Sequence, residues 1–92
     1  MRRRARVDAS QPEIVAALRG VGVGVQVLSA VGHGCPDLAV GYRHKTYLIE
    51  LKEGKSVLTP DERAWHDAWP GAAYVARSVE DVLRIIGLEV VE

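Results

Sequence analysis

Several features are scarce in this chain of 92 residues, which has one cysteine, no phenylalanine and no excess of either charge. A single cysteine excludes an internal disulfide and is compatible with a reducing compartment. A formal net charge of zero excludes a global attraction to nucleic acid, so any contact with phosphate requires a local basic patch. No apolar run approaches the roughly 20 residues of a membrane-spanning helix. We therefore expect a cytoplasmic protein that does not enter a membrane.

The residues that are present suffice for one small domain. Apolar residues make up 48% of the sequence, and Val, Leu, Ile and Ala must fill the interior in the absence of phenylalanine. A core can form at this length, although its stability is expected to be modest. Residues 1–9 are basic and polar, whereas residues 10–92 carry the periodic apolar pattern. We interpret the first segment as a tail and the second as the folded domain.

The apolar pattern predicts helices and strands in the order α-β-β-β-α-β-α. Helices are expected at residues 11–19, 60–69 and 79–86, and strands at residues 23–28, 38–40, 46–52 and 72–76. The expected helix N-caps are Ser10, Thr59 and Ser78. Glu62 stands three residues after Thr59 and would close a capping box with it. This order of elements indicates an α/β fold.

Two of the expected strands carry charged residues that a hairpin would bring together. Apolar and polar residues alternate in the segment 46–52, so Glu50 and Lys52 are expected on one face of the strand. Asp37 opens the preceding apolar run, and the polar, turn-rich segment 41–45 separates the two runs. A bend there would place Asp37 beside Glu50 and Lys52.

Two carboxylates and an ammonium group in this arrangement could hold a hard divalent cation and a polarised water. Each residue also has a simpler explanation. Asp37 follows a proline at the start of a strand, where turn acids are common, and Glu50 and Lys52 could be ordinary solvated charges. An acid-x-Lys triplet alone is weak evidence in a chain of this composition, so its weight depends on the hairpin around it.

The motif and its surroundings resemble the virus-type replication-repair nuclease (VRR-NUC) domain, a branch of the PD-(D/E)xK nuclease superfamily. The resemblance covers roughly residues 10–87, and its most specific parts are segments 34–38 (GCPDL), 49–54 (IELKEG) and 58–60 (LTP). It implies a restriction-endonuclease-like α/β core, in which helices flank a mixed central sheet. It also implies a bacterium or a phage-infected host cell as the place where the protein acts.

The resemblance assigns roles to five residues. Glu13, Asp37 and Glu50 would bind Mg²⁺, for which Mn²⁺ could substitute, and the backbone carbonyl of Leu51 would be a further ligand. Lys52 would orient the attacking water. Glu13 also has a simpler explanation, because an acid in the first turn of a helix is favoured by the helix dipole.

The implied activity is that of a metal-dependent, structure-selective DNA endonuclease that hydrolyses phosphodiester bonds. It would act on branched DNA, like the phage members of the family that resemble Holliday-junction resolvases. Flap or duplex cleavage is the alternative within the superfamily, and a non-catalytic DNA-binding or interaction module is the alternative outside it. The only sequence support for the latter is Glu62, which stands where the family commonly carries a glutamine. An ionised glutamate cannot donate a hydrogen bond as glutamine does.

Other residues could contact DNA, metal or a second copy of the chain. Candidate phosphate contacts are Arg2, Arg3, Arg4, Arg6 and His33. A solvated tail explains the arginines equally well, and a surface-loop position is the simpler explanation for His33. Zinc is disfavoured because the spacing of Cys35 and the histidines matches no paired-ligand pattern. Trp65 and Trp69 lie four residues apart on one helical face and, together with the Val-rich segment 23–28, could contribute to a homodimer interface.

Overall fold

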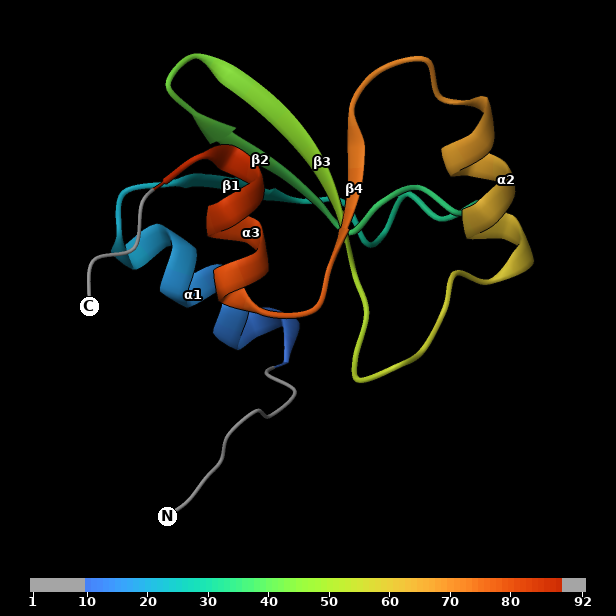
Figure 1. The fold of residues 1–92 in the computed structure, drawn as a ribbon, viewed down its shortest axis with the longest axis horizontal. Coiled ribbons are helices and arrows are strands. Elements are labelled where there is room, and N and C mark those ends of the chain that lie inside the picture. The colour runs from blue at the N-terminus through green and yellow to red at the C-terminus, as the bar shows by residue number, and fades with distance from the viewer. Residues whose placement is uncertain (1–9, 89–92) are drawn as a thin grey trace.

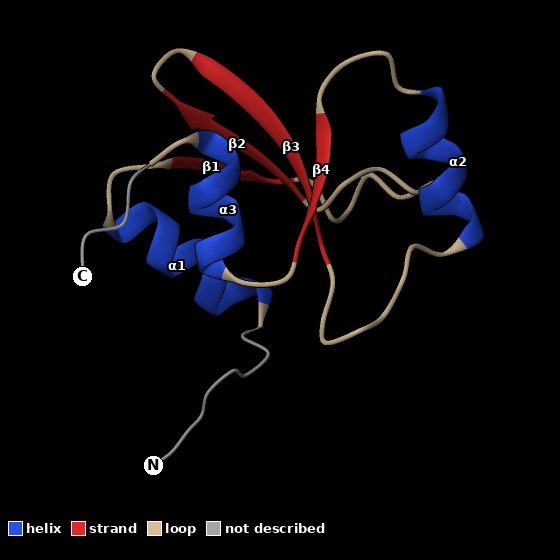
Figure 2. Ribbon diagram, viewed as in Figure 1, coloured by secondary structure: helices blue, strands red, loops and turns tan. Residues whose placement is uncertain are grey.

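The fold is that of a computed structural model, in which residues 10–88 are described. The expected tail at residues 1–9 and the last four residues, 89–92, lie outside this described part. The described residues form three helices and four strands in the predicted α-β-β-β-α-β-α order, and their arrangement can be followed in Figures 1 and 2. They are α1 (Gln11–Gly20), β1 (Gly24–Val27), β2 (Leu38–Tyr42), β3 (Lys45–Leu51), α2 (Pro60–Ala68), β4 (Ala73–Ala76) and α3 (Val79–Ile86).

The strands form one mixed sheet in the order β1-β2-β3-β4. Strand β2 pairs antiparallel with both β1 and β3, whereas β4 lies parallel to β3. The register pairs Leu38 with Ile49 and Tyr42 with Lys45 across β2 and β3. The prediction of an α/β fold with a mixed sheet, and the predicted order of its elements, are therefore confirmed.

The hairpin between β2 and β3 is closed by two residues, Arg43 and His44. Both have positive φ angles, 53° and 67°. Two consecutive positive φ angles are the signature of the type I′ turn, whose twist matches that of the paired strands. This tight turn fixes the register of the hairpin and therefore the residues that face each other at its open end.

Helix boundaries follow from local capping. Ser10 and Thr59 each form a complete capping box with the glutamate three residues later, and the side chain of Ser78 accepts from the backbone of Asp81. Helix α3 ends at Gly87, which adopts the left-handed conformation with φ of 82°. Glycine meets that requirement without the steric cost of a side chain.

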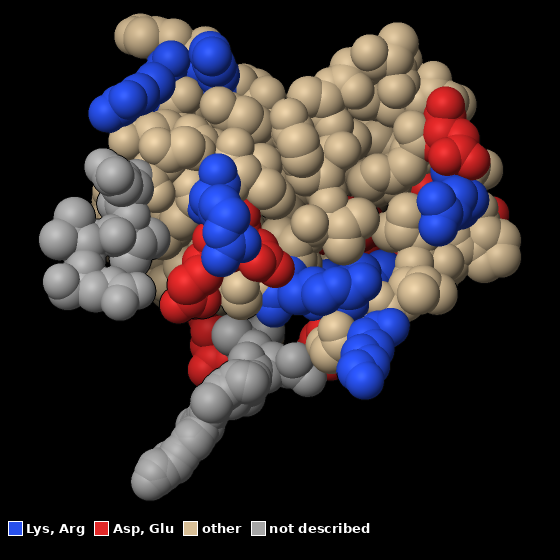
Figure 3. Space-filling view, viewed as in Figure 1, with Lys and Arg blue, Asp and Glu red and all other residues tan. Residues whose placement is uncertain are grey.

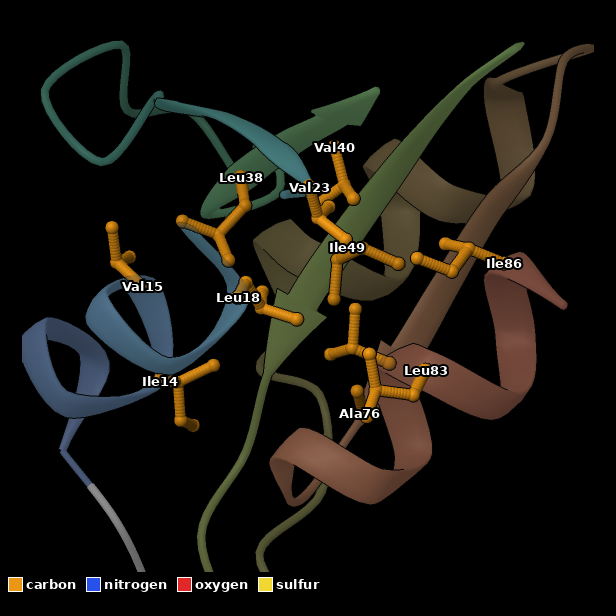
Figure 4. Close-up of a cluster of buried hydrophobic side chains, with 11 residues drawn as sticks. Ile14, Val15, Leu18, Val23, Leu38, Val40, Ile49, Ala76, Leu83 and Ile86 are labelled. Carbon is orange, nitrogen blue, oxygen red and sulfur yellow. The ribbon is translucent and has the colours of Figure 1, made fainter. Parts of the chain in front are cut away.

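The hydrophobic core lies on one face of the sheet, beneath α1 and α3. Figure 4 shows the core side chains of the two helices converging on those of the strands. The buried apolar residues are Ile14, Val15, Leu18, Val23, Leu38, Val40, Ile49, Ala76, Val82, Leu83 and Ile86. Because successive side chains of a strand point to opposite faces, Ile49 on the core side puts Glu50 on the other side.

Helix α2 stands apart from this core. None of its residues is buried, and Figure 1 shows it on the far side of β4 from α1 and α3. No helix in the range 10–88 is long and apolar enough to cross a membrane.

Candidate functional site

Asp37 is held at the open end of the hairpin by two neighbouring strands. It immediately precedes β2, and continuing the β2–β3 register places it opposite Glu50. Its carboxylate oxygen Oδ2 accepts a hydrogen bond of 2.8 Å from the backbone N–H of Leu51, and its backbone carbonyl accepts one of 2.7 Å from Leu28. The hairpin thus brings Asp37 beside Glu50, as the sequence predicted.

Glu50 carries the most strongly perturbed charge in the site. Only 3% of the residue is exposed, and its Oε1 atom has no hydrogen-bond partner among the described residues. Burial raises the pKa of this carboxyl to about 8, and the negative charges of Asp37 and Glu62 contribute to the same rise. In the absence of metal, this environment therefore favours the protonated form of the Glu50 carboxyl.

Lys52 lies two residues after Glu50, so its side chain is on the same face of the strand. Its backbone N–H donates a 3.0 Å hydrogen bond to the carbonyl of Ala76, which continues the pairing of β3 with β4. Its ammonium Nζ lies 2.7 Å from Oε1 of Glu62. This hydrogen bond raises the pKa of Lys52, so the side chain stays cationic beside the acids.

Glu62 is a site residue whose contact with Lys52 the sequence did not reveal. The same Oε1 atom accepts a 2.9 Å hydrogen bond from the backbone N–H of Thr59 and closes the predicted capping box. Burial alone would raise the pKa of Glu62, but the hydrogen bonds from Lys52 and Thr59 hold that pKa below its usual value. In the sequence, Glu62 stood out as the capping-box partner of Thr59 and as a departure from the glutamine that VRR-NUC domains commonly carry. Neither feature indicates a contact with Lys52.

The loop before Asp37 packs directly on the start of α2. Gly34 has a φ of +82°, and a Cβ atom there would collide with the carbonyl oxygen of Asp61 and lie 2.6 Å from its carbonyl carbon. Only glycine allows so close an approach in this backbone conformation. The contact fixes the end of α2 that carries Glu62 against the segment that leads into Asp37.

Glu13 is placed at a helix end. Its Oε1 atom accepts a 2.8 Å hydrogen bond from the backbone N–H of Ser10, and this contact lowers the pKa of the exposed carboxyl. Among the described residues, no hydrogen bond or ion pair links Glu13 with Asp37, Glu50 or Lys52. Its role as a metal ligand remains a prediction, and that role would require Glu13 to leave the capping box.

The residues that could hold a divalent cation are few. Between residues 10 and 88, no three His, Cys, Asp or Glu side chains are grouped so that they alone could hold a metal ion. The donors would instead be the carboxylates of Asp37 and Glu50, completed by backbone, water and substrate oxygens. Such a mixed oxygen set fits Mg²⁺, which usually retains several waters. The buried Glu50 oxygen without a partner also fits a cation ligand.

Of the residues predicted to contact DNA, His33 is the one that lies in the described part of the chain. His33 lies in an exposed loop with a φ of 58°, whereas the arginines at positions 2, 3, 4 and 6 fall outside the described residues. Two basic residues that the sequence did not single out lie near the open end of the hairpin. The guanidinium of Arg77 donates a 2.8 Å hydrogen bond to the carbonyl of Gly54, next to Lys55. Figure 3 shows basic side chains in separate groups on one face of the molecule.

No protein-family model, curated protein or solved structure gives a significant match to this chain. Any functional assignment therefore depends on the residues themselves and on the geometry described above.

Proposed function

We propose that the chain is a Mg²⁺-dependent, structure-selective DNA endonuclease of the VRR-NUC type, with a PD-(D/E)xK core. Its substrate would be branched DNA such as a Holliday junction. The observation that carries this proposal is the register that sets Asp37 opposite Glu50 at the open end of the hairpin, with Lys52 two residues further along the chain. Within that group, the Glu50 carboxyl is almost fully buried and one of its oxygens has no partner.

The chain's own groups have complementary roles in phosphodiester hydrolysis. The carboxylates of Asp37 and Glu50 would supply hard oxygen ligands, and the carbonyl of Leu51 is a further candidate. When bound, Mg²⁺ would polarise the scissile phosphate and lower the pKa of a coordinated water. The Lys52 ammonium would donate hydrogen bonds to the water and to the phosphate oxygens on which negative charge develops.

Glu50 must lose its proton before its carboxylate can serve as a ligand. Burial and the negative charges of Asp37 and Glu62 favour that proton on Glu50, and a bound divalent cation would relieve the repulsion among the three acids. A site that holds a proton when empty and exchanges it for a cation is chemically consistent with metal-dependent hydrolysis.

Binding of DNA would depend on local charge, because the chain has no net charge. Arg77 and Lys55 provide cations near the open end of the hairpin, where a phosphate backbone would have to pass. Selection by DNA structure is favoured over selection by base sequence, because a domain of this size has little room for a separate base-reading element.

A cleavage panel tests the proposal. Labelled four-way junction, flap, splayed and linear duplex DNA are incubated with the protein in Mg²⁺, in Mn²⁺ and in EDTA. We expect incision of the junction with either metal and none in EDTA. Asp37→Asn and Glu50→Gln should abolish incision, whereas Asp67→Asn, a change of an exposed acid on α2, should not.

The outcomes of the panel separate the alternatives. Preferred cleavage of flap or linear DNA would replace the junction-resolving role while keeping the nuclease. Binding of branched DNA without incision in either metal would reject the nuclease and support a non-catalytic module. Incision that persists in EDTA would reject the metal-dependent mechanism.

A further inference from the structure

The ion pair between Lys52 and Glu62 joins the hairpin to the start of α2 and has no role in the hydrolysis described above. We infer that Glu62 is a positioning residue that holds the Lys52 ammonium beside the Glu50 carboxyl. This inference rests on the proposed function for its kinetic consequence, but the positioning itself can be measured without any substrate.

The geometry of the pair differs from that of an ordinary surface salt bridge. The side chains of Lys52 and Glu62 are 14% and 20% exposed, and their nitrogen and oxygen are 2.7 Å apart. Exposed ion pairs contribute little to stability because water screens their charges and both side chains move freely. Partial burial reduces both effects here.

Glu62 is anchored independently of Lys52. Its Oε1 atom also accepts from the backbone N–H of Thr59, so the carboxylate is tied to the first turn of α2. The close contact of Gly34 with Asp61 in turn fixes that turn to the loop before Asp37. A flexible lysine side chain is thereby held by an acceptor whose own position is set by backbone atoms.

The arrangement leaves the ammonium able to act. A lysine ammonium has three N–H donors, and the bond to Glu62 occupies one of them. The remaining two can reach a water or a phosphate oxygen. A glutamine at position 62 would keep a capping box, but its neutral amide oxygen would hold the ammonium less strongly than a carboxylate does.

Amine labelling of the metal-free protein tests the positioning directly. The chain has three lysines, and Lys45 and Lys55 are exposed, so they serve as internal references for Lys52. An amine-reactive acetylating reagent is applied for short times, and labelled sites are quantified by peptide mass spectrometry. We expect Lys52 to react several-fold more slowly than the two references in the wild-type chain. Glu62→Gln should raise the labelling rate of Lys52 toward the rates of Lys45 and Lys55.

Thr59→Ala is the matched control. It removes the hydroxyl that caps α2 but keeps the backbone N–H that holds Glu62. We expect this variant to have a lower thermal midpoint while Lys52 remains protected. A fold check by circular dichroism accompanies both variants. Equal labelling of Lys52 in the wild type and Glu62→Gln, with the fold retained, would overturn the inference.

Cleavage kinetics provide the second readout. At saturating Mg²⁺ and DNA, Glu62→Gln should lower kcat by about tenfold, as expected for a misplaced catalytic group, with little change in KM. Thr59→Ala should keep kcat within about twofold well below its thermal midpoint. A Glu62→Gln kcat equal to that of the wild type would also overturn the inference. If the wild type cleaves no DNA but Lys52 shows the expected labelling contrast, the nuclease proposal fails and the positioning by Glu62 stands.

Discussion

At the scale of single residues, the site is defined by the different environments of three acids. Asp37 accepts from a backbone N–H, and Glu62 accepts from a backbone N–H and an ammonium. Glu50 is almost fully buried and has an oxygen without a donor. The pKa of Glu50 is therefore raised and that of Glu62 lowered, although the two residues are of one type. Environments that separate the pKa values of neighbouring acids are a common property of functional sites.

The first prediction separates metal binding from charge stabilisation. Asp37→Ala or Glu50→Ala should abolish both cleavage and productive binding of Mn²⁺, because the site would keep only one of its two carboxylates. Lys52→Ala should bind the metal normally but cleave about a hundredfold more slowly, as expected for loss of one donor to the developing charge. Single-turnover cleavage and calorimetric titration with Mn²⁺ provide the measurements. Wild-type cleavage by Lys52→Ala would contradict its assigned role.

The second prediction concerns pH and the metal-free stability. The pKa of Glu50 rises from 4.5 in the unfolded chain to about 8 in the folded one. Between these values the folded state retains a proton that the unfolded state has lost, so this group makes stability fall as pH rises. The slope is at most about 1.4 kcal/mol per pH unit. Burial is the largest cause of the raised pKa, the charges of Asp37 and Glu62 add to it, and Lys52 also faces the carboxyl.

Glu50→Gln removes this titration and keeps the shape of the side chain. Relative to the wild type, the variant should therefore gain stability from pH 6 to pH 8.5. Urea unfolding in EDTA at several pH values measures the difference in free energy of unfolding. A constant difference across this range would show that the Glu50 carboxyl is already ionised at pH 6.

At the scale of helices and strands, the sequence predicted most of the elements because their signals are local. Alternation in segment 46–52, the capping residues and the glycine after α3 act within a few positions of each other. The meeting of Asp37 with Glu50 was also predictable, since a short hairpin has few possible registers. The contact between Lys52 and Glu62 was not, because it depends on how α2 packs against a loop that lies almost thirty residues earlier in the chain.

The third prediction tests that packing through two glycines of the same loop. Gly34 and Gly32 both have positive φ angles, +82° and +76°, but only Gly34 lies against the backbone of α2. Alanine at either position should cost roughly 1 to 2 kcal/mol for the left-handed conformation. Gly34→Ala should reduce the stability more than Gly32→Ala does. It should also slow cleavage, because α2 and the loop before Asp37 must move apart.

Thermal unfolding and cleavage of the two variants provide the comparison. Gly32→Ala controls for the backbone conformation, since a Cβ atom there meets nothing within 4 Å. Equal losses of stability and activity in both variants would show that the contact of Gly34 with α2 does not hold the site together.

At the scale of the whole molecule, one helix remains without a covering layer. Helix α2 buries none of its residues, and the rings of Trp65 and Trp69 stack on each other with centroids 4.7 Å apart. Trp69, at the end of the helix, is 44% exposed, and Val57, which precedes its start, is 72% exposed. In the Val-rich segment, by contrast, Val23 is part of the core and Val25 packs against it, so Val27 is the exposed valine of that segment. The helix is thus the better candidate of the two surfaces for association.

The fourth prediction is a homodimer formed through α2. A four-way junction presents two equivalent strands, and a two-fold dimer would supply two sites to match them. Light scattering at micromolar concentration should give the mass of two chains. Trp69→Lys should give the mass of one chain with little change in thermal midpoint, because Trp69 lies outside the core, and Val27→Lys should remain dimeric.

The monomeric variant should still nick a junction but lose the coordinated second incision. A wild-type chain that is monomeric and makes both incisions would remove the paired-site arrangement and leave the nuclease proposal in place.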